Sequence, residues 1–181
     1  MKYLLMTLLG VFMMTEAQAM DLENTLYLEL KDGTVTIEMF PEAAPNHVAR
    51  IKELTREGYY NGKLWHRVIG GFMAQTGSPK GNGIGGSDKP DLEAEFNDIK
   101  HERGIVSMAR TNNPDSANAQ FFIMLAPSRH LDGQYTVWGR VVDGMDLVDN
   151  IKKGDQYDNG SVTDPDEIVS MKVAADAQSE Q

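Results

Sequence analysis

Two neighbouring segments near the start of the chain alternate between apolar and polar residues. Leucine occupies every second position across residues 26–30, and valine, isoleucine and methionine do the same across residues 35–39. Asp32-Gly33 lies between the two segments. A period of two on both sides of an Asp-Gly pair is typical of a β-hairpin.

The rest of the pattern predicts more strands and two helices. Pro45 suits a first helical position, the apolar residues at 48, 51 and 54 have helical spacing, and Gly58 ends the run. A second helix is predicted over residues 144–153. Further strands are predicted over residues 104–109, 120–125, 135–142 and 167–173, and residues 65–77 form two apolar segments around a turn at two glycines. About eight strands with no βαβ alternation indicate one all-β dominated domain, an antiparallel barrel or sandwich.

The first nineteen residues resemble a secretory signal. Lys2 precedes a short apolar run over residues 3–14, and Ala17-Gln18-Ala19 is a small-residue cleavage pattern. We therefore expect an exported protein, periplasmic or secreted, with a domain over residues 20–175 and a disordered tail over residues 176–181. An uncleaved membrane anchor is the alternative, although the apolar run is short for a bilayer span.

Charge and cysteine content narrow the range of partners. The 181-residue chain has a formal net charge of −10 and no cysteine. Disulfides are therefore impossible, and a chain of this length buries enough core without them. A strongly acidic surface disfavours nucleic acid and anionic membranes as partners.

An arginine lies inside an apolar run in the middle of the sequence. The stretch WHRVIGGFMAQTG covers residues 65–77, and alternation places Trp65 and Arg67 on one face, with His66 and Val68 on the other. Because burying a guanidinium without a partner is costly, Arg67 needs a reason to be there. A structural ion pair with a carboxylate is one explanation, and a functional site is another.

Other motifs carry less weight. Residues 81–86 fit a dinucleotide fingerprint, but Pro79 and Pro90 flank them and no helix is predicted after them.

The four histidines lack zinc-motif spacing, so we expect no metal. A Ser–His–Asp arrangement stays open, but no serine lies in a Gly-x-Ser-x-Gly elbow. Asn159-Gly160-Ser161 is a formal glycosylation sequon, and the same triplet also fits a turn.

Several segments, taken in order, resemble one family. Residues 65–69 and 71–77 are similar to the Phe-His-Arg and Gly-Phe-Met-x-Gln-x-Gly blocks of the cyclophilins, and residues 104–109, 119–123 and 130–133 match further blocks. The resemblance runs from about Thr25 to Val173. It implies a closed eight-stranded antiparallel β-barrel capped by two α-helices.

The resemblance also implies peptidyl-prolyl cis–trans isomerase activity, without a cofactor or a metal. Carried over by position, the implied catalytic residues are Arg67, Phe72, Gln75 and Phe122. The implied substrate-binding residues are Met73, Ala109, Arg110, Gln120, His130, Leu131 and Tyr135. They would lie outside the barrel around a pocket for the proline ring. The expected partners are proline-containing peptides and unfolded exported proteins, bound by a monomer.

Three positions depart from the family pattern. His130 stands where drug-sensitive members carry tryptophan, so we expect weaker cyclosporin binding. Tyr135 replaces a common histidine. Arg110 replaces a common asparagine, in a loop that is one residue longer, and would favour acidic peptides.

Two alternatives to a folding isomerase remain. One is a peptide-binding or assembly module whose isomerase activity is incidental, which a proline-isomerisation assay would separate from the enzyme. The other is a β-barrel carrier of small ligands, which requires an open interior.

Overall fold

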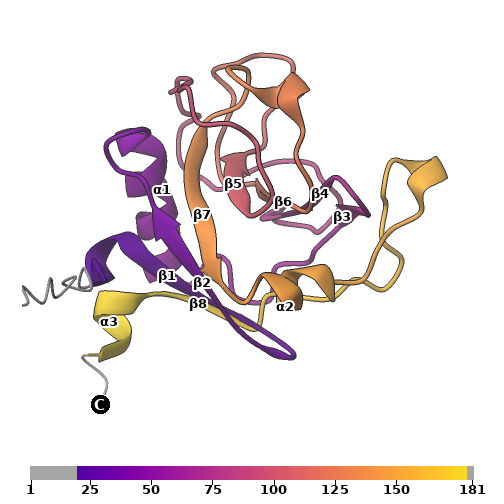
Figure 1. Cartoon of the computed structure of the whole chain (residues 1–181), viewed down its shortest axis with the longest axis horizontal. Helices are drawn as coiled ribbons and strands as arrows, with labels where there is room; N and C mark the ends of the chain where they lie inside the picture. Colours follow the sequence, from indigo (N-terminus) through magenta and orange to yellow (C-terminus); the bar gives the residue numbers. More distant parts are fainter. Residues whose placement is uncertain (1–19, 179–181) are drawn as a thin grey trace, which may run out of the picture.

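Eight antiparallel strands form one strongly curled sheet in the computed structural model, which describes residues 20–178 (Figure 1). The strand order is β3-β4-β6-β5-β7-β2-β1-β8. The strands are β1 (Thr25–Leu30), β2 (Gly33–Met39), β3 (Arg67–Ile69), β4 (Met73–Thr76), β5 (Ile105–Met108), β6 (Phe121–Met124), β7 (Val137–Asp143) and β8 (Ser170–Val173). The predicted all-β fold of eight antiparallel strands is confirmed. The predicted export signal at residues 1–19 lies outside the described residues.

The two ends of the sheet meet through the residues that precede its edge strands. Leu64 and Glu167 form an antiparallel bridge. The amide of Trp65 donates to the carbonyl of Asp166 at 2.9 Å, and the amide of Ile168 donates to the carbonyl of Lys63 at 2.8 Å. The barrel is therefore completed by short extended segments rather than by direct pairing of β3 with β8.

The first hairpin follows its alternating pattern. Leu26 pairs with Ile37 and Leu28 with Val35, and all four side chains are fully buried. Because side chains alternate between the two faces of a strand, this register places one face of both strands in the core.

The helices agree only in part with the sequence prediction. Helix α1 (Pro45–Arg56) begins at the predicted proline and buries the predicted apolar stripe. The predicted helix over residues 144–153 is too long, since α2 covers only Met145–Asp149. The ammonium of Lys153 donates to the carbonyls of Asp149 and Ile151, which replaces hydrogen bonds that further helical turns would have made. The barrel thus has one long helix, α1, and short elements elsewhere, including the 3₁₀ turns η1 (Leu22–Asn24), η2 (Arg129–Leu131) and η3 (Gln156–Asp158).

The C-terminal segment is more ordered than predicted. We expected residues 176–181 to be disordered, but residues 176–178 belong to helix α3 (Ala174–Gln178), and residues 179–181 lie outside the described part. Ala174 is fully buried, and Asp176 forms an ion pair with Arg56 at 2.8 Å. Alanines favour a helix, and this docking against α1 stabilises it.

Two apolar clusters lie on opposite sides of the barrel wall. The interior is filled by large side chains, among them Trp65, Trp138, Tyr60 and Phe121, which pack edge to face. The outer cluster contains Met73, Ile105, Phe122, Met124, Leu131 and Val137. Since the interior is filled with side chains, the carrier hypothesis fails, and the outer cluster is the apolar surface available to a ligand.

The alternation predicted around Arg67 is wrong in one detail. Trp65 and Val68 both lie in the interior cluster, whereas Arg67 lies on the outside. The strict period of two does not extend back to Trp65, because β3 begins only at Arg67. The arginine is therefore directed away from the core.

Candidate functional site

A hollow of about 350 Å³ lies on the outer wall of the barrel, and we call it the Arg67 pocket. Strands β3, β4 and β6 contribute to it, together with η2 and the loops at residues 109–110 and 134–135. It is lined by Arg67, Phe72, Met73, Gln75, Ala109, Arg110, Phe122, His130, Leu131, Gln134 and Tyr135. Ten of the eleven predicted site residues therefore surround one pocket, and only Gln120 does not line it.

Neutral acceptors hold the guanidinium of Arg67. Its Nε donates to the carbonyl oxygen of Asn159 at 3.0 Å, and its Nη2 donates to Asn159 Oδ1 at 2.9 Å. Nη1 donates to Gln75 Oε1 at 3.1 Å and lies 3.8 Å from Met73 Sδ. Because Nη2 carries two hydrogens, one of them has no partner among residues 20–178. That N–H remains available to a bound ligand.

The positive charge of Arg67 is not neutralised. No carboxylate pairs with this guanidinium in the described part of the chain, so the ion-pair explanation does not hold. Partial burial lowers the pKa of Arg67 from the ordinary arginine value, yet an arginine side chain stays protonated in proteins. The pocket therefore offers a permanent cation beside an apolar surface.

The apolar walls of the Arg67 pocket come from distant parts of the sequence. Met73, Phe122 and Leu131 are 1%, 4% and 7% exposed. The ring of Phe122 meets Tyr135 edge to face at 5.8 Å between centroids. Phe72 lies against His130, with ring centroids 5.8 Å apart. These side chains can surround a compact apolar ring.

A hydrogen-bonded group of three polar side chains contacts Phe122 through a histidine. The ring of His101 stacks on Phe122 at 6.3 Å, its Nε2 lies 2.9 Å from Ser107 Oγ, and its Nδ1 lies 3.1 Å from Asp132 Oδ1. A Ser–His–Asp arrangement is thus present. Ser107 and His101 are both 0% exposed, so no substrate reaches the serine, and hydrolysis by this group is excluded. Desolvation lowers the pKa of His101.

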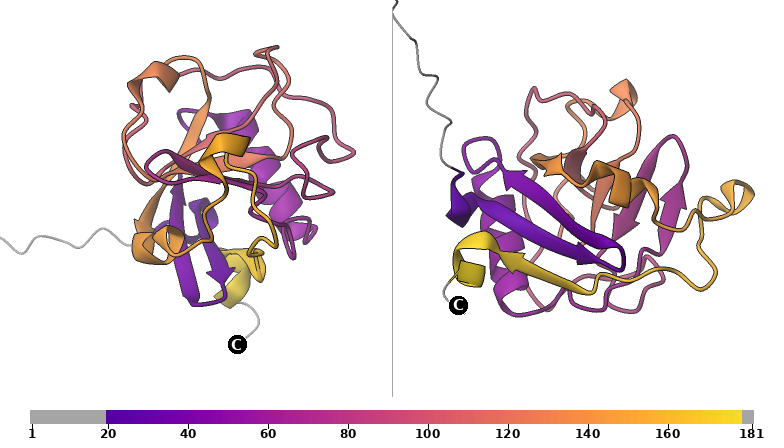
Figure 2. Two further views of the ribbon diagram at one scale, coloured as in Figure 1. Left: turned by 90° about the vertical axis from the view of Figure 1, so that its right-hand side faces the viewer. Right: turned by 60° about the horizontal axis from the view of Figure 1, so that its bottom comes forward.

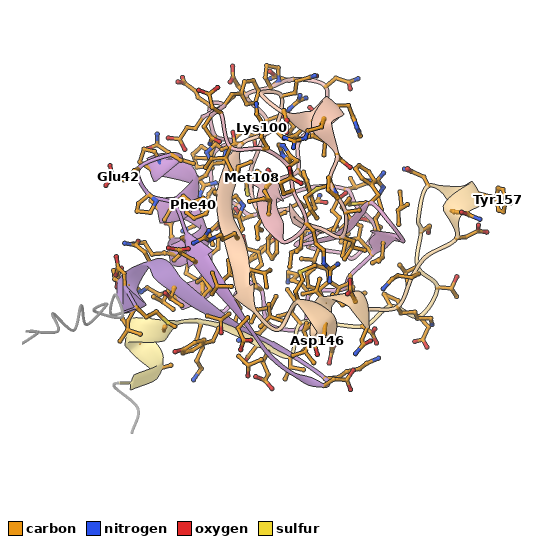
Figure 3. The ribbon with its side chains drawn as sticks, viewed as in Figure 1. Phe40, Glu42, Lys100, Met108, Asp146 and Tyr157 are labelled. Carbon is orange, nitrogen blue, oxygen red and sulfur yellow. The ribbon has the colours of Figure 1, made fainter. Side chains whose placement is uncertain are left out.

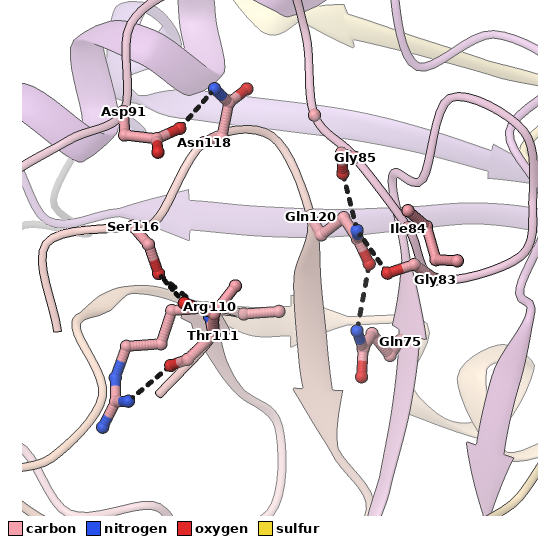
Figure 4. Close-up of a pocket in the computed structure, with 12 residues that line it drawn as sticks. Gln75, Gly83, Ile84, Gly85, Asp91, Arg110, Thr111, Ser116, Asn118 and Gln120 are labelled. Carbon is pink, nitrogen blue, oxygen red and sulfur yellow. Dashed lines mark hydrogen bonds between the residues drawn. The ribbon is translucent and has the colours of Figure 1, made fainter. Parts of the chain in front are cut away.

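Side-chain amides connect the Arg67 pocket to a second hollow of about 390 Å³, which we call the Gln120 pocket (Figure 4). Gln75 Nε2 donates to Gln120 Oε1 at 3.1 Å. Gln120 Nε2 in turn donates to the carbonyls of Gly83 and Gly85 at 3.0 and 2.8 Å. The glycine-rich loop that fits a dinucleotide motif is therefore one wall of a pocket, and its carbonyls face an amide donor.

Arg110 lies between the two hollows. Gln75, Ala109 and Arg110 line both pockets. The guanidinium of Arg110 lies 4.4 Å above the ring of Tyr135 and donates to the carbonyls of Gln134 and Thr111. A chain bound across both pockets would pass this cation.

Comparison with known proteins identifies the family. Residues 25–173 match the family model described as cyclophilin type peptidyl-prolyl cis-trans isomerase/CLD. The chain belongs to the cyclophilin family. It is therefore a peptidyl-prolyl cis–trans isomerase, and its substrates are proline-containing peptides or proteins.

Relatives and solved structures agree with this family. A probable peptidyl-prolyl cis-trans isomerase of Brucella suis is 54% identical over 90% of this chain and 88% of its own length. Peptidyl-prolyl cis-trans isomerase B of Bacillus subtilis is 43% identical over 73% of this chain and 93% of its own. The crystal structure of the cyclophilin AquaCyp293 from Hirschia baltica is similar with a TM-score of 0.76 and 32% identity, covering 86% of this chain and 76% of that one.

A third similar structure includes a small ligand in its description. It is a Cryptosporidium parvum cyclophilin type isomerase crystallised in the presence of the dipeptide Ala-Pro, with a TM-score of 0.75 and 27% identity. The match covers 82% of this chain and 98% of that one.

Sequence reasoning missed some residues of this cyclophilin's site. Gln134 lines the Arg67 pocket, and Asn159 holds Arg67. Asn159 belongs to the sequon that also reads as a turn, and its left-handed backbone, with φ of 51°, confirms the turn. Nothing in the local pattern indicated that this turn contacts Arg67, 92 residues earlier.

Two kinds of feature are absent from residues 20–178. No group of three or more histidine, aspartate or glutamate side chains in that range is arranged to hold a metal ion. No helix within the same residues is both long and apolar enough to cross a bilayer.

Proposed function

We propose that Arg67 accelerates rotation about Xaa–Pro bonds by donating to the prolyl nitrogen while the bond is twisted. The observation that carries this proposal is a cation with neutral partners and a free N–H at the edge of an apolar pocket. The Ala-Pro dipeptide used with the Cryptosporidium relative supports a proline ring as the occupant.

The chemistry explains why a fixed donor suffices. Rotation opposes amide conjugation, with a barrier of roughly 18–20 kcal/mol. At the halfway point the nitrogen loses its conjugation and regains a lone pair. A donor directed at that lone pair binds the twisted state better than either planar state, which lowers the barrier. No covalent intermediate forms, and no proton is transferred.

Arg67 acts together with the rest of the site. A rate gain of about 10⁵ needs roughly 7 kcal/mol, whereas one hydrogen bond from a charged donor contributes about 1.5–3 kcal/mol. The remainder comes from preorganised polar groups in a groove with little water and from immobilising the proline. In this proposal Phe72, Met73, Phe122 and Leu131 hold the ring, with His130 and Tyr135 at its rim. Gln75, Gln120 and the backbone of Ala109 and Arg110 orient the peptide.

Replacing Arg67 by alanine tests the mechanism. We expect Arg67→Ala to lower kcat/KM on a proline tetrapeptide by at least about tenfold, because the lost hydrogen bond contributes mainly to the twisted state. Circular dichroism and the urea unfolding midpoint should remain close to those of the wild type, since the guanidinium lies outside the barrel interior.

Arg140→Ala is the matched control. Arg140 is exposed, pairs with Glu38 at 2.7 Å and lines neither pocket, so its removal should leave kcat/KM unchanged. Unchanged turnover in Arg67→Ala, or equal losses in the two variants, would rule out the proposed role.

For the cell, we propose that the enzyme is exported after cleavage of residues 1–19 and assists the folding of other exported proteins as a monomer. The apolar run and the Ala-Gln-Ala pattern support export. Sequencing the N-terminus of the purified protein tests export, with Met20 or Asp21 expected as the first residue; a protein that begins at Met1 would contradict it.

The alternative function is a peptide-binding or assembly module. If Arg67→Ala complements a deletion strain as well as the wild type does, that alternative is favoured.

A further inference from the structure

The loop over residues 154–161 extends away from the barrel, beyond the strands that form the pocket (Figures 1 and 2). Tyr157, in η3, lies at its outer end and is 92% exposed (Figure 3). The base of the same loop contacts Arg67. The loop thus connects an exposed tip to the guanidinium of Arg67.

Backbone hydrogen bonds fix the base of this loop to β3. The amide of Val68 donates to the carbonyl of Gly160 at 2.8 Å, and the amide of Gly154 donates to the carbonyl of Val68 at 2.9 Å. Within the loop, the amide of Gly160 donates to the carbonyl of Asp155 at 2.7 Å. Gly160 is required, because a Cβ there would lie 2.3 Å from Ile69 Cγ1. Asn159 is therefore held at a defined position beside Arg67.

The conformation of Asn159 suits asparagine. Its φ of 51° lies in the left-handed region, which asparagine and glycine adopt more easily than other residues. In this conformation its carbonyl oxygen and Oδ1 accept from Arg67 Nε and Nη2, at 3.0 and 2.9 Å. Two acceptors on one residue match two donors on one edge of the planar guanidinium. Gln75 contacts Nη1 on the other side.

We propose that Asn159 is a positioning residue for isomerisation, which fixes the plane of the Arg67 guanidinium so that the free Nη2 hydrogen is directed at the bound prolyl nitrogen. The amide is neutral, so it orients the guanidinium without cancelling its charge. This inference rests on the proposed role of Arg67. It adds that the loop over residues 154–161, and not only the neighbouring strand, determines how well Arg67 works.

Asn159→Gly is the informative variant. Glycine tolerates the left-handed backbone and keeps the carbonyl acceptor, so the loop retains its conformation while Oδ1 is lost. We expect kcat/KM on a proline tetrapeptide to fall about fivefold and the affinity for the peptide to change less than twofold, because the apolar walls remain in place. The Nε–H resonance of Arg67 in a ¹H–¹⁵N spectrum should shift or broaden.

Tyr157→Ala is the matched control in the same loop. Its side chain is exposed and lines neither pocket, so kcat/KM and the Arg67 resonance should both stay unchanged. An equal loss in Tyr157→Ala and Asn159→Gly would indicate general loosening of the loop and would overturn the inference.

A double-mutant cycle separates positioning from a structural effect. In the Arg67→Ala background, adding Asn159→Gly should change kcat/KM by less than about twofold, because no guanidinium is left to orient. Additive losses would contradict the inference. If Arg67→Ala lowers turnover but Asn159→Gly does not, only the positioning role fails; if Arg67→Ala has no effect, the proposed function fails as well.

Discussion

The positively charged side chain of Arg110 lies between the two pockets of this cyclophilin. The guanidinium of Arg110 rests on the ring of Tyr135, and backbone carbonyls of Gln134 and Thr111 accept its hydrogen bonds. No carboxylate of the described chain neutralises it. The contact with Tyr135 fixes the cation where a peptide spanning both pockets would meet it, because an arginine is attracted to an aromatic face.

We therefore expect a modest preference for an acidic residue next to proline. Tetrapeptides with glutamate before proline should be turned over about two- to fivefold faster than those with lysine, since an exposed ion pair contributes up to about 1 kcal/mol. In Arg110→Asn this ratio should fall towards one, and added salt should reduce it in the wild type. Equal ratios for the two proteins would eliminate Arg110 as a selectivity residue.

At the scale of elements, a long loop determines how helix α1 begins. The helix has no side-chain cap from its own N-cap residue, Ala44. Glu95 supplies one from a distance, since its carboxylate accepts from the amides of Asn46 and His47 at 3.0 and 2.9 Å and contacts His47 Nδ1 at 2.6 Å. Burial by itself would raise the pKa of Glu95, but the hydrogen bonds from His47 and Asn46 together outweigh it and lower the pKa. The positive end of the helix dipole lies at the N-terminus of α1, and it also stabilises this carboxylate.

Glu95→Ala should therefore destabilise the protein by about 2 kcal/mol, because two helix amides and His47 lose their acceptor together. Urea unfolding followed by circular dichroism measures this free energy. Glu42→Ala is the matched control, since Glu42 is exposed three residues before α1 and should change the free energy of unfolding by less than about 0.5 kcal/mol. Similar values for the two variants would show that Glu95 is not a significant cap.

At the scale of the whole molecule, three buried histidines link stability to pH. Burial lowers the pKa values of His47, His66 and His101, with desolvation as the largest cause in each, and the neighbours Glu95 and Asp132 only partly oppose it. The unfolded chain takes up protons near the ordinary histidine pKa of about 6.5, whereas the folded protein resists them. Protonation below that pH therefore favours the unfolded chain.

The free energy of unfolding should consequently be greatest above about pH 6.5 and fall as the pH drops towards the lowered histidine values. Urea midpoints at pH 7.5 and 5.5 test this, and most carboxylates remain ionised at both values, so the histidines dominate the difference. A midpoint that is unchanged or higher at pH 5.5 would contradict it.

The extent of sequence-based prediction differed between elements. The alternation across residues 26–39 and the stripe of α1 predicted those elements, because the period of burial is local. The predicted helix over residues 144–153 was too long, because the side chain of Lys153 satisfies nearby carbonyls, which the spacing of apolar residues does not show. The helix at residues 174–178 is stabilised by the ion pair between Asp176 and Arg56, which lie 120 positions apart. Family resemblance supplied the pocket residues; composition and periodicity alone stopped at an unexplained arginine.

The sequence alone determined a β-rich fold, its order of strands along the chain and the presence of Arg67 in an apolar stretch, since these depend on neighbours within a few residues. Only the tertiary structure decided which face Arg67 takes, that neutral groups rather than a carboxylate hold it, and that Asn159 and Gln134 join the site. The physical reason is distance along the chain. Hydrogen bonds and ring contacts between residues dozens of positions apart form only when the barrel closes, and no local pattern encodes them.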